Sequence, residues 1–272
     1  MSKHSGLVVS SPCVVNRDKG GFTLVELLVV IAVIALLMAI LLPALTRAKE
    51  QGKRAVCLHH LQQLMVAWIM YADSNNDKIV RGDVGEYDNI HAGEPPWVQR
   101  DYDANNLEER RNAIEKGALF RYTKDLRVYK CPTGQSENIR MYSSVDSMNS
   151  TDGLTGHLTG IGAGSRMIKV RQQIRKPYER IVFYDDGCLG DNAMGGFTIR
   201  VYKNSDTGSQ AWWDDPPIRH GFGSTFSYAD GHTEYYKWRD KRTGTLNPNQ
   251  PGNEDMRWFS IGVWGAPPVD RE

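Results

Sequence analysis

The sequence has no excess of charge of either sign. Its 272 residues include 33 Lys and Arg and 32 Asp and Glu, which gives a formal net charge of +1 at pH 7. Proteins that bind nucleic acid usually gather basic residues into a patch or stripe, and a near-neutral chain offers no global footprint of that kind. We therefore expect no nucleic-acid partner.

Short catalytic signatures are also lacking. The chain contains no H-E-x-x-H zinc motif, no G-x-S-x-G nucleophile elbow and no G-x-x-x-x-G-K phosphate loop. Its acidic clusters do not match an EF-hand loop. These absences leave no catalytic constellation in the sequence, and we expect a protein that is not an enzyme.

Charged and polar side chains are missing from Leu27 to Leu42. Extended to Phe22 and Leu45, the apolar stretch approaches the roughly 20 residues that a helix needs to cross a bilayer core. Its apolar residues occupy every face, which excludes an amphipathic surface helix. A secretory signal is cut after a shorter apolar region, whereas here the pair Gly20-Gly21 precedes the run. We expect a retained membrane anchor.

Residues Lys19–Glu26 read K-G-G-F-T-L-V-E at the start of this run. The junction resembles the N-terminus of type IV prepilins and of the pseudopilins of type II secretion systems. The resemblance implies that a membrane peptidase cuts between Gly21 and Phe22 and methylates the new amino group of Phe22. It also divides the chain into a leader peptide (residues 1–21), a transmembrane and filament-core helix (22–45) and an extracytoplasmic globular domain (46–272).

Glu26 is an isolated acid within the apolar helix. A carboxylate there costs about 2.5–3.5 kcal/mol on insertion scales, so it usually has a partner and a function. The resemblance implies that it pairs with the N-terminal amine of a neighbouring subunit, here that of Phe22. The alternative is that Glu26 simply reaches the lipid headgroups. Pro43 lacks a backbone donor and is expected to kink or break the helix, at a place where filament-forming helices often carry a proline.

The resemblance also implies partners and a location. The partners are a prepilin peptidase with N-methyltransferase activity, other pilin or pseudopilin subunits, an inner-membrane assembly platform and membrane lipid. Basic residues flank the apolar run on both sides, so counting them does not select an orientation. On the resemblance alone, we expect a single pass through the inner (cytoplasmic) membrane, a cytoplasmic leader and a periplasmic domain that enters a filament after assembly.

The segment Arg47–Ala72 is predicted to continue the helix. Its apolar residues recur at spacings of four and three, as in a stripe that packs against a sheet, and they are Cys57, Leu61, Leu64, Trp68 and Tyr71. The polar cluster at 73–77 should end the helix, because its residues favour turns. Strands are predicted at Arg180–Tyr184, at Gly196–Tyr202 and in a hairpin within Thr225–Trp238.

A helix first and strands later predict an α+β fold. As in pilins, a long N-terminal helix would pack on an antiparallel β-sheet with long loops. Most late aromatic residues are expected to pack in the core, with Trp212-Trp213 as an exposed pair.

The hairpin carries a second pattern. Nine residues separate His220 from Asp230-Gly231, and Asp-Gly is a preferred pair for a two-residue turn. This H-x9-D-G pattern resembles prepilin-like families of Planctomycetes and Verrucomicrobia, which also tend to carry a cysteine after the anchor and a Cys-Pro pair. His220, Asp230 and His232 would supply ligands for zinc. A structural hairpin is the favoured interpretation, because backbone geometry alone explains an aspartate in a turn.

Calcium is the more plausible ion from sequence. Asp185, Asp186 and Asp191 crowd a loop that contains glycine, and calcium prefers several oxygen ligands at such loops. The resemblance points the same way, because major pseudopilins carry calcium in their C-terminal loops. A solvated acidic turn is the favoured alternative, and no other cofactor is expected.

The sequence holds four cysteines, of which Cys13 would leave with the leader. An extracytoplasmic domain can form disulfides, and the odd remainder leaves one cysteine free or intermolecular. We predict a Cys57–Cys131 pair, because Cys57 lies on the apolar stripe and Cys131 follows an apolar segment. Cys188 would then be unpaired.

Two functions are compatible with these patterns. The first is a non-enzymatic pilin or pseudopilin subunit of a type II secretion or type IV pilus-like filament. The alternative is a membrane-anchored envelope protein that displays a binding or enzymatic C-terminal domain. The absence of a linker after the anchor favours the first, whereas the size of the soluble region keeps the second open.

Overall fold

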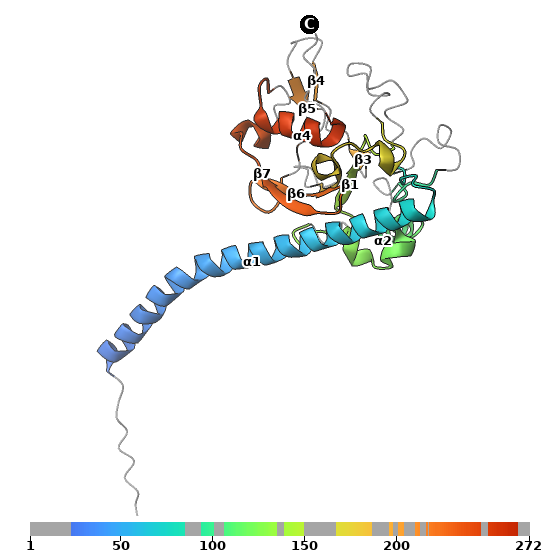
Figure 1. The fold of residues 1–272 in the computed structure, drawn as a ribbon. Helices are drawn as coiled ribbons and strands as arrows, with labels where there is room; N and C mark the ends of the chain where they lie inside the picture. The colour runs from blue at the N-terminus through green and yellow to red at the C-terminus, as the bar shows by residue number, and fades with distance from the viewer. Residues whose placement is uncertain are drawn as a thin grey trace, which may run out of the picture. The chain divides into compact units, whose positions relative to one another are not determined.

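The computed structural model (Figure 1) divides the chain into two compact units, Met1–Arg47 and Ala48–Glu272. The residues that it describes are 23–84, 94–100, 106–134, 139–149, 167–186, 196–197, 201–203, 210–212, 216, 218–245 and 250–265.

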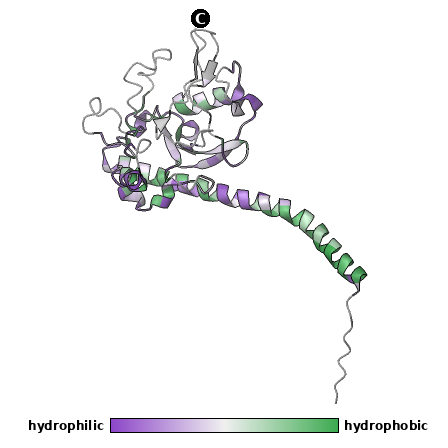
Figure 2. Ribbon diagram, turned by 180° about the vertical axis from the view of Figure 1, so that it is seen from behind, coloured by the Kyte–Doolittle hydropathy of each residue, from purple (hydrophilic) through white to green (hydrophobic). Residues whose placement is uncertain are grey.

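The helix α1 (Leu24–Ser74) runs for 51 residues and belongs to both units. In the first unit all its side chains are exposed, and Figure 2 shows strongly hydrophobic residues on this part of the helix. Among the described residues, α1 is the one helix long and apolar enough to cross a membrane, judged by length and composition. It continues through Pro43, so the helix is not broken there.

In the second unit, α1 contributes the predicted apolar stripe to the core. Its buried side chains are Cys57, Leu61, Leu64, Met65, Ala67, Trp68, Tyr71 and Ala72. The helix ends at Ser74, and Asn76 and Asp77 then adopt positive φ values of 56° and 64°. Both predictions, the stripe and its polar stop, are confirmed.

The main sheet has five strands in the order β3-β1-β2-β6-β7. The strands β1, β2, β6 and β7 pair antiparallel, and the short β3 pairs in parallel with β1 at the edge. The fold is therefore α+β with a pilin-like architecture, as predicted. The strands are β1 (Tyr142–Val145), β2 (Ile181–Asp185), β3 (Gly196–Phe197), β6 (Gly223–Tyr228) and β7 (Thr233–Lys237).

A second, two-stranded sheet pairs β4 (Val201–Lys203) with β5 (Gln210–Trp212). The predicted single strand Gly196–Tyr202 is therefore wrong, because its two ends belong to different sheets. Residues 198–200 lie outside the described part of the chain.

Two helices cover opposite faces of the main sheet (Figure 1). Successive side chains of a strand point to opposite faces, and β2 is buried along its whole length. Its Asp185 faces α1, where Oδ2 lies 3.1 Å from the Sγ atom of Cys57. Its Tyr184 faces α4 (Glu254–Trp264), where the ring centroid lies 6.0 Å from that of Phe259. The sheet thus packs on the long helix, as predicted, and α4 closes the other side.

The helix α4 was not predicted from the sequence, although its ends carry recognisable caps. The side chain of Asn253 accepts hydrogen bonds from the backbone N–H groups of Asp255 and Met256, and Gly265 ends the helix with φ of 71°. Within the described residues, the remaining short helices are α2 (Leu107–Glu115), α3 (Phe120–Thr123), η1 (Leu126–Tyr129), η3 (Arg171–Gln173), η4 (Pro177–Glu179) and η5 (Lys241–Gly244).

The expectation of an exposed Trp212 is wrong. Its side chain is 2% exposed and packs edge-on against Trp238, with ring centroids 6.4 Å apart. Its indole Nε1–H donates to Oε1 of Gln250 at 3.2 Å, which satisfies the polar atom of a buried ring. The neighbouring Trp213 lies outside the described residues.

The predicted hairpin joins β6 and β7, with register pairs from Gly223↔Lys237 to Ser227↔Thr233. Its turn differs from the prediction. The N–H of Gly231 donates to the carbonyl of Tyr228 at 2.8 Å, and the N–H of Tyr228 donates to the carbonyl of His232 at 3.0 Å. Gly231 has φ of 97°, whereas Asp230 is not in the positive-φ region. A two-residue type I′ turn needs positive φ at both central residues, so this is a three-residue loop with a glycine bulge.

Candidate functional site

The start of α1 is closed by Thr23 and Glu26. The backbone N–H and the hydroxyl of Thr23 donate to Oε2 of Glu26 at 2.9 and 2.8 Å. In return, the N–H of Glu26 donates to Oγ1 of Thr23 at 3.2 Å. These reciprocal bonds form a capping box of the T-x-x-E type. Within one chain Glu26 is therefore a helix cap, and any pairing with a neighbouring subunit has to share or replace these bonds.

Pro43 lies inside α1, four residues before Arg47. Proline has no N–H, so the helix passes this position with one backbone hydrogen bond fewer. Close by, the hydroxyl of Thr46 donates to the carbonyl of Leu42 at 2.9 Å. Gly21 and Phe22, between which the cleavage is predicted, lie outside the described residues.

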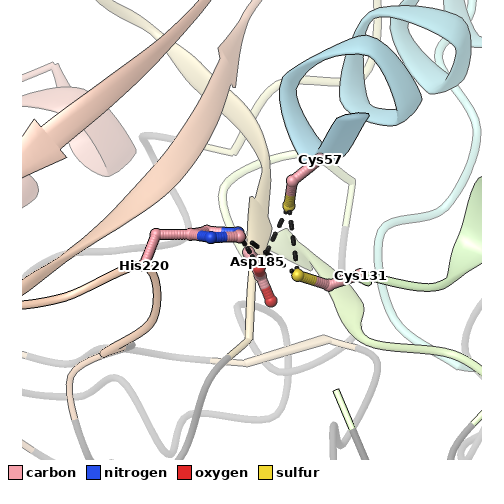
Figure 3. Close-up of side chains that lie close together, drawn as sticks. All are labelled: Cys57, Cys131, Asp185 and His220. Carbon is pink, nitrogen blue, oxygen red and sulfur yellow. Dashed lines mark hydrogen bonds and ion pairs between the residues drawn. The ribbon is translucent and has the colours of Figure 1, made fainter. Parts of the chain in front are cut away.

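A second group of functional side chains meets in the second unit, where Cys57, Cys131, Asp185 and His220 point toward one another (Figure 3). The cysteines and Asp185 are 0% exposed, and so is the side chain of His220. The Sγ atoms of the two cysteines lie 3.4 Å apart. Nε2 of His220 lies 3.3 Å from Sγ of Cys131 and 3.6 Å from Oδ2 of Asp185.

Four separate segments position this cluster. Cys57 belongs to the buried stripe of α1, and Cys131 follows η1. Asp185 is the last residue of β2, and His220 precedes β6 with a positive φ of 54°. The site therefore exists only when α1, the loop after η1 and the two central strands are assembled.

Electrostatic interactions within the cluster shift its pKa values. Burial raises the pKa of the Cys57 thiol. The hydrogen bond from Cys57 lowers the pKa of the Cys131 thiol to about 7. Burial lowers the pKa of His220, but hydrogen bonds with Asp185 and Cys131 outweigh that effect and raise it to about 10. The cluster thus holds a protonated imidazole beside Asp185, away from water.

The structure regroups residues that the sequence assigned to different sites. Cys57 and Cys131, predicted as a disulfide, are adjacent free thiols. Asp185, predicted as a calcium ligand, lies beside both of them. Asp186 is buried apart from the cluster, where its Oδ2 accepts a hydrogen bond from Ser143 at 2.7 Å. Asp191 lies outside the described residues, and calcium binding stays a prediction.

The three residues of the H-x9-D-G pattern also separate. His220 joins the buried cluster, whereas Asp230 and Gly231 form the hairpin turn. Oδ1 of Asp230 accepts from the N–H of His232 at 3.1 Å and lies 2.6 Å from its Nδ1. The His232 ring stacks on Tyr228 with centroids 4.2 Å apart. Asp230 and His232 therefore serve the turn, and the zinc set considered from sequence does not describe this arrangement.

Comparison with known proteins bears on the N-terminal segment. Residues 16–42 match the family model described as the prokaryotic N-terminal methylation motif. The chain carries a type IV pilin-like methylation motif. The motif includes Gly21, Phe22 and the cap residues Thr23 and Glu26, and it ends directly before Pro43. Together with the exposed apolar part of α1, it is consistent with membrane anchoring and with a pilus filament.

Similarity to a curated type IV pilin agrees with this motif. The chain is 42% identical over 60 residues to the type IV wide pilus major component PilA4 of Thermus thermophilus. The matched segment is 22% of this chain and 46% of that relative, so the chain spans about half the length of the curated relative that it matches. No solved structure matches the chain.

Two features of these sites were missed from sequence. The capping box around the methylation motif has a local signal, because threonine followed three residues later by glutamate before an apolar run is typical of a helix start. The buried cluster has a weaker sequence signal, which is only that cysteine and histidine are frequent metal ligands. Nothing in the spacing of Cys57, Cys131, Asp185 and His220 brings them together.

Proposed function

We propose that this chain is a non-enzymatic filament subunit of the pilin or pseudopilin class. The observation that carries the proposal is the first part of α1, where the apolar run Leu27–Leu42 lies within the methylation motif and is exposed on every side. A helix of that composition needs either lipid or other apolar helices around it. A pilin-like subunit uses both in turn, first as a membrane anchor and then in the core of a filament.

Processing would precede assembly. A prepilin peptidase would cut between Gly21 and Phe22 and methylate the new amine of Phe22, one residue before the cap residue Thr23. The helix starts at Leu24, so cleavage at this point leaves the helix and its cap intact. The leader would lie in the cytoplasm and the second unit in the periplasm, with α1 held in the inner membrane.

Assembly would then draw α1 out of the lipid. At an inner-membrane platform, the apolar residues of the helix would exchange contacts with lipid for contacts with the same helix of other subunits. Glu26 would pair with the amine of Phe22 on a neighbour and so fix the register between subunits. A charged pair of this kind is favoured in surroundings of low dielectric constant, where an unpaired carboxylate is costly. Both a type II secretion filament and a type IV pilus-like filament would use this step.

The test is mass spectrometry of the N-terminal peptide of protein purified from native membranes and from sheared filaments. We expect a peptide that begins at Phe22 with one added methyl group in both fractions. The variant Gly21→Leu should keep its leader and stay in the membrane, because a bulky side chain replaces glycine at the cleaved bond. Gly6→Leu makes the same change within the leader, away from that bond, and should be processed normally.

A leader that remains attached in the presence of an active peptidase would refute the proposal. So would cleavage after Leu42, which would release the second unit from its anchor. Normal processing with no subunit in the sheared fraction would instead support an anchored envelope protein that displays its C-terminal domain.

A further inference from the structure

We propose that Cys57, Cys131, Asp185 and His220 form a four-coordinate site for a zinc-class divalent cation. The site lies entirely within the second unit. The inference does not depend on the proposed filament function, because the metal would bind whether or not the leader is removed.

The spacing of the ligand atoms fits a tetrahedral centre. With Zn–S bonds of about 2.3 Å and Zn–N and Zn–O bonds of about 2.0–2.2 Å, neighbouring ligand atoms in such a site lie roughly 3.3–3.8 Å apart. Here one atom from each of the four residues lies within 4.8 Å of all the others. The separations along the ring Asp185–Cys57–Cys131–His220–Asp185 are 3.1, 3.4, 3.3 and 3.6 Å. Small rotations of the side chains would admit the ion.

The donor set selects the class of metal. Two thiolates and an imidazole suit zinc and neighbouring transition metals, whereas calcium prefers six to eight oxygen ligands. Two thiolates and the Asp185 carboxylate carry three negative charges, of which a divalent ion offsets two. Arg219 offsets the third, because its Nε lies 3.0 Å from Oδ1 of Asp185. Binding would release the remaining thiol and imidazole protons to solvent.

An outer shell already orients His220 for this role. Its Nδ1 lies 2.8 Å from Oε1 of Glu50, so Nδ1–H donates to that carboxylate and Nε2 is left to face the cluster. A carboxylate behind a histidine ligand is a recurrent feature of zinc sites. Glu50 and Cys57 are two helical turns apart on α1, and both approach His220 or its cluster from one face of the helix. His220 also keeps the left-handed backbone conformation, with φ of 54°, which is unfavourable for a bulky side chain.

The cysteine ligands are oriented too. The hydroxyl oxygens of Thr225 and Tyr142 each lie 3.2 Å from Sγ of Cys57. Oγ1 of Thr133 lies 3.0 Å from Sγ of Cys131. Hydroxyl donors at this range stabilise thiolates, the form in which cysteine binds metal.

A disulfide between Cys57 and Cys131 is the competing state of the same atoms. It would need the sulfur atoms about 2.05 Å apart, whereas they are 3.4 Å apart as free thiols. A disulfide also gives no role to the buried Asp185 and to a histidine aimed by Glu50. A metal centre accounts for all four side chains and for the glutamate behind them.

The experiment uses the full chain, purified in detergent under reducing and metal-free conditions, then given one equivalent of Zn²⁺ or Co²⁺ and desalted. The number of metal ions per chain is measured by inductively coupled plasma mass spectrometry. The coordination of the Co²⁺ form is measured by its ultraviolet–visible absorption spectrum. We expect one zinc per chain, unaffected by excess Ca²⁺, and a cobalt spectrum with thiolate charge-transfer bands and the visible bands of tetrahedral cobalt.

Variants locate the site. Cys131→Ser and Asp185→Asn should each lose the bound metal, whereas the matched controls Cys188→Ser and Asp230→Asn should keep one per chain. Glu50→Gln should weaken zinc binding by about 10–100-fold. The same change should leave the metal-free chain folded, because the side-chain oxygen of Gln can still accept from Nδ1–H of His220 and Glu50 acts through His220 as a positioning residue.

Several results would overturn the site. These are no metal retained by the reduced wild-type chain, retention unchanged in Cys131→Ser and Asp185→Asn, or a cobalt spectrum without thiolate bands. A complete Cys57–Cys131 disulfide, found by trapping thiols in protein from native membranes, would do so as well. Where Cys131→Ser fails to fold, the wild-type cobalt spectrum still decides, because it reports the thiolate ligands directly.

Discussion

Substitutions at Glu26 separate the role of a helix cap from that of a charge between subunits. Glu26 closes a capping box with Thr23 through three hydrogen bonds, whereas the proposed assembly step needs its negative charge. Glu26→Ala removes both functions. Glu26→Gln keeps an oxygen that can accept from Thr23 but has no charge. Thr23→Ala keeps the charge and removes the two bonds that the threonine hydroxyl makes.

The two roles of Glu26 differ in the free energy that each contributes. Loss of a helix cap typically costs about 1 kcal/mol, which is roughly a fivefold change in an equilibrium. An ion pair at about 4 Å is worth on the order of 4 kcal/mol at an effective dielectric constant near 20, before the cost of desolvation. We therefore expect Glu26→Gln and Glu26→Ala to lower filament incorporation by at least about tenfold. Thr23→Ala should lower it by no more than about fivefold.

The assay is quantitative immunoblotting of sheared filaments, normalised to the processed subunit in the membrane. Hydrogen exchange of the first turn of α1 in detergent serves as the control, because it reports the cap alone. In that control the first turn should exchange faster in Thr23→Ala and in Glu26→Ala than in wild type. The exchange rate of Glu26→Gln should lie between that of wild type and those of the two Ala variants.

The opposite ranking would refute the reasoning. If Glu26→Gln assembled like wild type while Thr23→Ala failed as Glu26→Ala did, the capping box would explain the requirement for Glu26. The carboxylate would then act within its own helix, and no amine of a neighbouring subunit would be needed.

Further predictions concern the second unit and are tested by thermal unfolding of the full chain in detergent. Gly231→Ala should cost about 1–2 kcal/mol, because its φ of 97° lies outside the conformations that alanine favours, and a gain in stability would contradict the turn. Gly52→Ala should stabilise the chain by about 1 kcal/mol, because nothing lies within 4 Å of the added Cβ in an exposed helical turn. Asp255→Ala should lower the midpoint by about 6–12 °C, since it removes the acceptor of the half-buried Tyr236 hydroxyl and of the buried Thr243 hydroxyl. A shift below about 2 °C would show that water replaces the carboxylate.

The long helix could be predicted because its signals are local. The apolar run Leu27–Leu42 and the stripe from Cys57 to Tyr71 each repeat over many turns, so a single misplaced residue does not hide the period. The β6–β7 hairpin was predictable for the same reason. Its turn was wrong by one residue, because Asp-Gly is compatible with both a two-residue turn and a three-residue turn with a bulge. The φ angle at Asp230 decides between them, and strand register sets that angle.

Strands without such signals were harder to predict. The segment Gly196–Tyr202 alternates like one strand, yet β3 joins β1 in parallel and β4 pairs with β5. Alternation reports only that a segment is half-buried and extended. It does not report which neighbour supplies the hydrogen bonds. Trp212 was misjudged by a related error, because charges and prolines next to it in sequence are not next to it in space, where Trp238 covers it.

The buried cluster shows the same limit in its chemistry. Each of its four residues drew attention from sequence, but for three different reasons: two cysteines as a disulfide, Asp185 as a calcium ligand and His220 as part of a hairpin pattern. Local spacing favours partners that are close in the chain, such as Asp186 for Asp185 or Asp230 for His220. The fold instead joins residues as far apart in the chain as Cys57 and His220, because α1 lies across the sheet at the ends of β2 and β6. A carboxylate, an imidazole and two thiols lie together there in the core. Asp185, which was predicted to bind calcium in a loop, therefore faces two sulfur atoms. The identity of a metal site follows from the whole donor set, and only the packing of the helix on the sheet determines that set.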